Sequence, residues 1–331
     1  MFEILLSGST QGLMWGLLAL GFYIAFRILD FADMTCEGSI TLGATVTSLC
    51  LWKGVSAFVA MPVAFFAGCV AGAVTGVLNT KLKIAPILSG ILTMSALYSV
   101  NIHVMGAATG AAGTANLSLL KYSSSTVFAI IQKIIPLTKT NVALIFGTVT
   151  TFAVMGALYW FFGTELGCAI RATGTNANMC RAQGINTDIT KITGLALANG
   201  LIALSGSLLC MYQGYADVKM GVGSIVIALA SIIIGEAIFA RARNFFLRLL
   251  GIVVGSVIYR VIVALVIYSG MPSDDLKLMT AAVVVAALGI TAFKSHITKF
   301  FQRVRKFIKK LIGDIPLFGG RGCDGKAGDA K

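Results

Sequence analysis

Uncharged apolar runs of membrane-spanning length recur along this chain and constrain its fold more than any motif does. Nine of them occur, near residues 11–28, 38–52, 56–80, 85–106, 142–163, 191–212, 224–240, 246–268 and 277–293. An α-helix needs about 20 apolar residues to cross about 30 Å of hydrocarbon, whereas membrane strands are shorter and alternate in polarity. The sequence therefore predicts an all-α, polytopic membrane protein with about 8 to 10 transmembrane helices, nine being the best count.

The few charged residues are unevenly distributed. They make up 12% of the 331 residues, against about 25% in soluble domains. The net charge of +13 could suit nucleic acid, but the basic residues lie in short clusters between apolar runs. Sixteen Lys and Arg fall on the side of the membrane that carries residues 164–190, and six on the other. Because basic loops stay inside, we expect this segment and the C-terminus in the cytoplasm and the N-terminus outside.

Three regions depart from a simple series of spans. The second run is short and follows "RILDFADMTCEG", which predicts a broken or re-entrant helix near residues 30–50. Residues 107–141 form the largest external loop, with a short amphipathic helix expected over residues 126–135. The transmembrane domain, residues 1–293, keeps its first run as a span rather than a signal peptide, since no basic region precedes it.

The C-terminal residues 294–331 differ from the rest. The stretch "HITKFFQRVRKFIKKLIG" places apolar residues on one helical face and most cations on the other. Such a basic amphipathic helix should lie on the inner leaflet, although docking to a protein is an alternative. The Gly-rich end is expected to be disordered.

Glycines recur at small-xxx-small spacing, which lets helix backbones approach closely in lipid. They lie in three runs, at Gly8, Gly12 and Gly16, at Gly68, Gly72 and Gly76, and at Gly251 and Gly255. Ordinary membrane-protein packing explains each one. Together they predict a compact helix bundle.

Motifs of catalysis are missing from the sequence. It contains no GxxxxGK[ST] phosphate loop, no HExxH and no GxSxG. The seven cysteines are scattered without a CxxC pair or histidines at metal spacing, so they are interpreted as small apolar fillers, with no metal site expected. Transport is therefore favoured over a membrane enzyme or scaffold.

Polar residues at membrane depth are costly and mark candidate positions on a translocation path. Asp30, Asp33 and Glu37 lie between the first two runs, where a solvated cytoplasmic turn is the alternative. Asn101 and His103 lie near the end of the fourth run, where hydrogen-bonded packing is the alternative.

Two further charged residues call for partners. Glu236, at the inner end of its helix, could pair with Arg241 or Arg243. Arg260 lies midway along an apolar helix and needs a partner or a watery cavity.

The cytoplasmic segment 164–190 is the most specific feature. Its small and polar residues suit packing against another protein, although an ordered loop without a partner is the alternative. We expect a short helix over residues 177–183, ended by Gly184, with Asn186 or Thr187 as the N-cap of the next helix.

At this segment the sequence resembles a known family. The stretch "GCAIRATGTNANMCRAQGINTDITKITGLALANGLIALSGSLL" is similar to the signature of ABC importer permeases of the branched-chain amino acid, ribose and simple sugar type. The N-terminal "GLMWGLLALGFYIAFRILDFADMTCEGSITLGA" is similar to the opening of the same family. The resemblance runs from about residue 8 to residue 290.

The resemblance implies a multi-pass subunit of the bacterial inner membrane that does no catalysis. The segment would contain a coupling helix that docks into an ATP-binding cassette subunit, which would bind ATP and Mg while this chain binds no cofactor. A second permease copy, with a homodimer favoured, and an external substrate-binding lipoprotein are the other implied partners. The implied coupling residues are Arg171, Ala172, Asn176, Ala177, Asn178, Arg181, Gly184 and Ile185.

The substrate is less well defined. After the seventh run the chain has "IIIGEAIFARARNFFLRLLG" instead of the Gly-Gly-x-Gly of branched-chain amino acid permeases. It resembles a branch associated with aromatic amino acid binding proteins. This favours an amino acid substrate, and among amino acids an aromatic one, over a sugar or nucleoside. An ion-coupled transporter using Asp33, Glu37 or His103 is the competing hypothesis.

Overall fold

The computed structural model describes residues 2–110, 113–119, 125–134, 138–239 and 244–268, with residues 278, 281, 282, 284, 285 and 289. The described helices and strands belong to one compact unit, Met1–Ala287. Apart from those isolated positions, the predicted ninth span and the basic tail lie outside the described residues.

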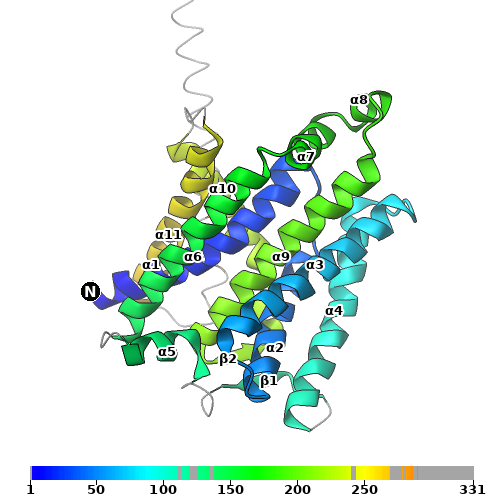
Figure 1. The fold of residues 1–331 in the computed structure, drawn as a ribbon. Helices are drawn as coiled ribbons and strands as arrows, with labels where there is room; N and C mark the ends of the chain where they lie inside the picture. Colours follow the sequence, from blue (N-terminus) through cyan, green and yellow to red (C-terminus); the bar gives the residue numbers. More distant parts are fainter. Residues whose placement is uncertain are drawn as a thin grey trace, which may run out of the picture. The chain divides into compact units, whose positions relative to one another are not determined.

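Helices make up most of this unit (Figure 1). In chain order the elements are α1 (Phe2–Tyr23), the π-helix η1 (Ile24–Ile28), α2 (Cys36–Trp52), α3 (Ala57–Thr80), α4 (Pro86–Thr109), β1 (Asn116–Ser118), α5 (Val127–Ile134), α6 (Lys139–Phe161), α7 (Glu165–Thr175), α8 (Ala177–Ala182), α9 (Thr187–Gln213), β2 (Tyr215–Asp217), the 3-10 helix η3 (Val218–Gly221), α10 (Ser224–Ile238) and α11 (Phe245–Tyr268).

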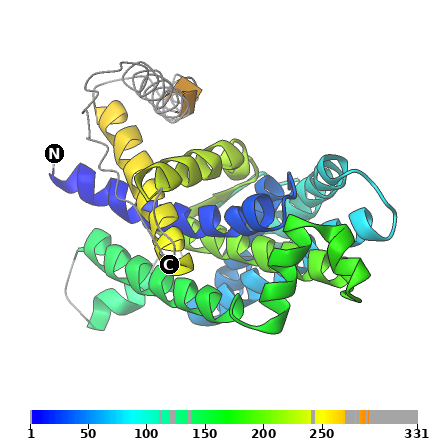
Figure 2. The same cartoon turned by 90° about the horizontal axis from the view of Figure 1, so that it is seen from above.

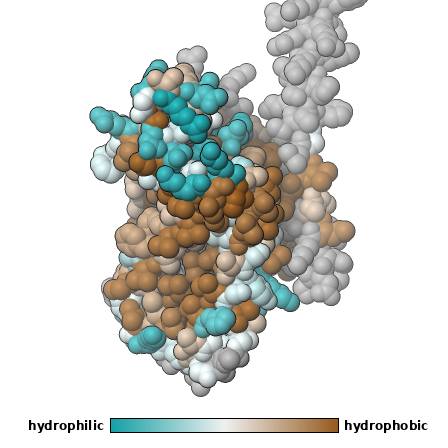
Figure 3. Space-filling model, turned by 90° about the vertical axis from the view of Figure 1, so that its right-hand side faces the viewer, coloured by the Kyte–Doolittle hydropathy of each residue, from teal (hydrophilic) through white to brown (hydrophobic). Residues whose placement is uncertain are grey.

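Within the described ranges, seven helical segments are long and apolar enough to cross a membrane. They contain α1 with η1, α3, α4, α6, α9, η3 with α10, and α11. The short second predicted run forms α2, whose 17 residues rise only about 26 Å, and it is not among these seven. Figure 3 shows one face of the molecule, on which a broad apolar band separates polar residues at the two ends. The polytopic α-helical fold is thus confirmed.

Helix α9 is the centre of the bundle. It packs against α1, α2 and α3. Of the most apolar 18-residue stretch of α9, 83% is buried inside the protein. Seen from above (Figure 2), α10 and α6 lie on opposite sides of α1. The remaining spans each present a wider apolar face to the surroundings.

The small-xxx-small glycines lie at helix contacts, as predicted. A Cβ atom on Gly72 would overlap the carbonyl oxygen of Leu195 in α9, and Gly68 and Gly76 also face α9. The first glycine run faces α11, and Gly255 faces the carbonyl of Ser231 in α10. Close backbone approach therefore replaces the hydrophobic effect as the source of helix packing in lipid.

The chain between α1 and α2 is irregular and partly buried. After η1, residues 29–35 are not helical, yet Phe31 and Asp33 are buried. Helix α2 then runs beside α9, where Ser39 donates to the Asn199 side chain at 2.6 Å and Thr47 donates to Ser207 at 2.7 Å. The predicted interruption near residues 30–50 is therefore confirmed, with protein covering the irregular backbone.

The opposite end from α7 and α8 contains a small sheet that the sequence did not indicate (Figure 1). Strands β1 and β2 pair antiparallel, with Leu117 opposite Ala216. Nearby, α5 confirms the predicted amphipathic helix of the long loop. Three-residue strands carry too little alternation to be recognised from sequence.

Candidate coupling interface

The segment between α6 and α9 folds into two short helices at one end of the bundle (Figure 1). Each helix start has a side-chain cap: Thr164 accepts from Gly167 N at 3.4 Å, Asn176 from Met179 N at 3.1 Å, and Asn186 from Asp188 N at 3.1 Å. Gly184 follows α8 with φ +81°, a conformation that glycine adopts without strain. The predicted short helix and its end are thus confirmed.

Helix α7, which was not predicted, attaches this segment to the bundle. The Oγ1 atoms of Thr173 and Thr190 lie 3.0 Å apart, and a Cβ atom on Gly174 would overlap the carbonyl oxygen of Ile28 in η1. The signal for α7 was Thr164 followed by Glu165, a cap residue with an acid in the first turn.

Arg171 also anchors α7. Its guanidinium lies 4.1 Å from the ring centroid of Phe245 and 5.3 Å from that of Phe162. These cation–π contacts commit this implied coupling residue to packing within the chain.

Helix α8 is anchored on one side and exposed on the other. Cys180 is fully buried, and its carbonyl accepts from Ile185 N at 2.9 Å. Met179 is 50% exposed, although methionine usually lies inside. Sequence reasoning missed Met179, whose signal is that it is the one large apolar residue in a short polar helix.

The other implied coupling residues divide by environment. Asn176, Asn178, Arg181 and Gly184 are exposed, whereas Ala172, Ala177 and Ile185 are half-buried. Asn176 is occupied as the cap of α8. Asn178, Arg181 and Gly184 are therefore exposed without capping a helix, as is the neighbouring Met179, although Arg181 Nε also donates to Thr187 Oγ1.

Asp33 lies in a buried hydrogen-bond network. Its side chain is 1% exposed; Oδ1 accepts from Thr35 N at 2.8 Å and Oδ2 from Asn199 Nδ2 at 2.7 Å. Thr35 in turn bonds Thr75 at 2.8 Å. A solvated turn is therefore wrong for Asp33, whereas the neighbouring Asp30 is exposed.

The remaining candidate path residues do not share one environment. Glu37 Oε1 accepts from Gly223 N at 2.9 Å, just before α10. Asn101 is buried, and its Nδ2 donates to Gly38 O at 3.4 Å, while its Oδ1 has no partner among the described residues. His103 is exposed on α4. The structure therefore joins Glu37 of α2 to the start of α10 and Asn101 of α4 to α2, whereas His103 takes no part in these contacts.

Glu236 pairs with a residue that was not expected. Its Oε1 accepts from Arg27 Nε at 3.0 Å, so η1 and α10 are joined, and Arg241 and Arg243 lie outside the described residues. Both side chains are about half exposed, and exposed pairs contribute little. We expect Glu236→Gln to change the free energy of unfolding by less than about 1 kcal/mol, measured by thermal unfolding in detergent.

Arg260 finds an aromatic partner. Its guanidinium carbon lies 4.2 Å from the ring centroid of Trp15 in α1. This cation–π contact supplies the partner that a cation inside an apolar helix needs.

The described helices of membrane-spanning length define a multi-pass membrane protein. The family model for the permease component of branched-chain amino acid transport systems matches residues 4–288. The chain belongs to this family, and as an ABC transporter permease it is a non-catalytic subunit.

Named relatives carry different substrates. The tyrosine transport system permease protein of Clostridioides difficile (strain R20291) is 41% identical over 86% of this chain and 90% of the relative. The ribose import permease protein RbsC of Escherichia coli (strain K12) is 26% identical over 78% and 74%. A solved structure of a metal-chelate type ABC transporter in an inward-facing conformation matches 88% of this chain and 85% of its own, with 13% identity and a TM-score of 0.47.

Proposed function

We propose that this chain is the membrane permease of an ATP-driven importer. Separate cassette subunits bind ATP and Mg, a second copy of the permease completes the path, and an external lipoprotein delivers the solute. The observation that carries the proposal is the exposed surface of α8 on a segment packed firmly against the bundle. Such a surface suits a partner that pushes on the membrane helices.

The contacts of this segment support a route for that push. From α8 the chain leads directly into α9, and α7 packs against η1 at Gly174. The π-helix and the irregular residues 29–35 connect this contact to α2. Since π-helical turns occur frequently at functional sites, a displacement of α8 is expected to reach Asp33 and α2 through them.

An amino acid, and specifically an aromatic one, is the proposed solute. The support is the identity of 41% to a tyrosine permease. The ribose permease keeps a sugar or nucleoside as the alternative. In such importers the external binding protein sets most of the substrate selectivity. The path through the permease therefore needs only to accommodate the solute.

A line of polar residues on α4 supports the proposal that the solute passes along this helix. Ser95, Ser99 and His103 follow at four-residue intervals on its exposed side, next to exposed apolar residues such as Leu92 and Tyr98. Histidine Nδ1 lies 2.8 Å from the Ser99 carbonyl, which can only accept, so Nδ1 is assigned as the donor. In the tautomer with its proton on Nδ1, the ring presents Nε2 as an acceptor, which suits a hydroxyl or ammonium group.

His103→Leu tests this path. Losing one hydrogen bond to the moving solute is expected to lower uptake about tenfold, measured as initial rate in vesicles, with unchanged co-purification of the ATPase. His103→Gln keeps an acceptor and should recover part of the rate. Equal rates in the wild type and His103→Leu would remove His103 from the path.

Reconstitution tests the function itself. The chain, its ATPase and its binding protein are placed in vesicles, and labelled tyrosine uptake is measured with and without ATP. ATP-dependent uptake that unlabelled tyrosine, but not ribose, suppresses is the expected result. Uptake by the permease alone, driven by an ion gradient, would establish the competing ion-coupled transporter instead.

A further inference from the structure

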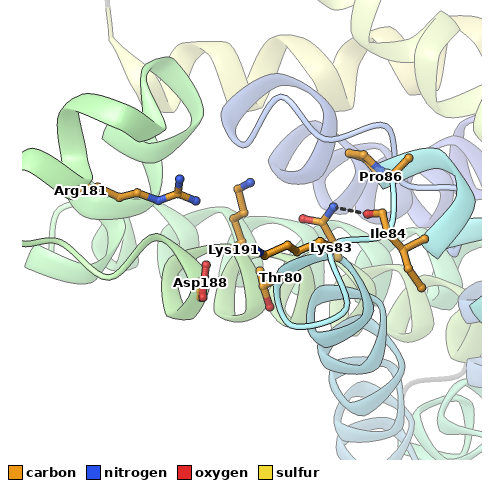
Figure 4. A pocket seen from close by; sticks show the side chains of 9 residues that line it. Thr80, Lys83, Ile84, Pro86, Arg181, Asp188 and Lys191 are labelled. Carbon is orange, nitrogen blue, oxygen red and sulfur yellow. Dashed lines mark hydrogen bonds between the residues drawn. The ribbon is translucent and has the colours of Figure 1, made fainter.

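A basic cavity lies beside the candidate coupling interface. Its volume is about 540 Å³. Figure 4 shows that three basic side chains from different elements line it, Arg181 from α8, Lys191 from α9 and Lys83 from the α3–α4 connection. Asp188 is the acidic member of the lining. Three cations against one acid leave an excess of positive charge around an open space.

The cavity walls are held in place. Asn79 Nδ2 donates to the Ile84 carbonyl at 2.8 Å, which closes the α3–α4 connection. Lys83 has φ +54°, a backbone conformation that costs a non-glycine residue energy. Arg181 Nε donates to Thr187 Oγ1 at 2.8 Å. No ion pair joins the cavity's cations to Asp188 in the part of the chain that the structure describes.

The cavity lies where three apolar helices end. Thr80 is the last residue of α3, Pro86 the first of α4, and Lys191 lies in the second turn of α9. Apolar side chains are exposed beside it, with Leu82 63% exposed and Ile87 and Leu88 each 50% exposed. These three residues adjoin the lining residues Lys83 and Pro86 in the sequence. Cations next to exposed apolar side chains match the headgroup level of a bilayer.

We propose that this cavity binds the headgroup of an anionic phospholipid. The phosphate would sit among Lys83, Arg181 and Lys191, with the acyl chains on the exposed apolar residues of α3 and α4. A soluble phosphate would use the cations but not Leu82, Ile87 or Leu88. A carboxylate of the ATPase would more readily meet the exposed tip of α8 than this level of the bundle.

Bound lipid would link the α3–α4 connection to both ends of the α8–α9 turn. The lipid then strengthens the attachment of the segment through which the ATPase acts. This effect on coupling rests on the proposed function, whereas lipid binding itself does not.

Lipid binding is tested with the full chain, without transport. The purified protein is titrated with phosphatidylglycerol in phosphatidylcholine vesicles, and bound lipid is measured. The variant Lys83→Gln/Lys191→Gln is expected to bind phosphatidylglycerol at least about fivefold more weakly for each lysine removed. The control variant Lys53→Gln/Lys219→Gln removes the same charge from exposed residues elsewhere and should bind as the wild type does.

Three results would overturn the site. Equal loss in both variants would mean that only net charge matters. Full competition by soluble glycerophosphate would identify a free phosphate site. Unchanged lipid binding with reduced co-purification of the ATPase would assign the cavity to a protein carboxylate. Since binding is measured without solute or ATP, a failed transport assay leaves this test unaffected.

Discussion

Met179→Asp is expected to abolish coupling while leaving the permease folded. The side chain is half exposed at the tip of α8, so the free chain tolerates a carboxylate there. In a docked complex that carboxylate would be buried without a partner, which costs about 2 kcal/mol or more, or about thirtyfold in affinity. Co-purification of the ATPase and ATP-dependent uptake should both fall by this factor.

A matched control is available at the other end of the molecule. Val222 is 58% exposed in the turn before α10, so Val222→Asp makes the same chemical change far from α8. It should retain the ATPase. If Met179→Asp also retains the ATPase and its uptake, α8 does not carry the docking surface.

Gly72→Val is expected to prevent assembly of the bundle. Its Cβ atom would overlap the Leu195 carbonyl oxygen and lie 2.9 Å from Asn199 Cβ. Separating α3 from α9 to relieve this overlap costs about 3 kcal/mol or more, a large part of a total stability of about 5 to 15 kcal/mol. The yield of monodisperse protein in detergent should collapse, and any remainder should unfold at a lower temperature.

Gly156→Val serves as the control for this substitution. Gly156 lies in α6, and a Cβ atom there would meet no atom within 4 Å. Valine is a better helix former than glycine by a few tenths of a kcal/mol, so this variant should be as stable as the wild type. Equal behaviour of the two valine variants would show that the α3–α9 contact tolerates separation.

The sequence predicted what depends on local pattern. Apolar runs located the spans, glycine spacing located close helix contacts, and Asn186 with Gly184 located the ends around α8, because each signal resides in neighbouring residues. The sequence could not indicate which helix the glycines of α3 pack against. It also could not place Asn199 beside Asp33, because these two residues are far apart in the sequence. The ion pair of Glu236 with Arg27 was not predicted for the same reason, because Arg241 and Arg243 lie closer to Glu236 in the sequence.

The candidate coupling residues show the same division. A motif marks positions but does not separate those that face a partner from those that hold the segment. Arg171 stacks on Phe245, and Asn176 caps α8, so their occurrence is explained within the chain. Met179, which the motif did not mark, is a large apolar side chain that is half exposed and so available to a partner.

Helix α9 is one unbroken rod between the two faces of the membrane. Its 27 residues rise about 40 Å, starting directly after α8 and ending at Gly214 before β2. Strand β2 is paired with β1 of the long loop. A tilt imposed at the α8 end is therefore expected to move this loop without crossing a hinge. If the proposed function holds, a single rigid helix would join the end that the ATPase contacts to the end that receives the solute.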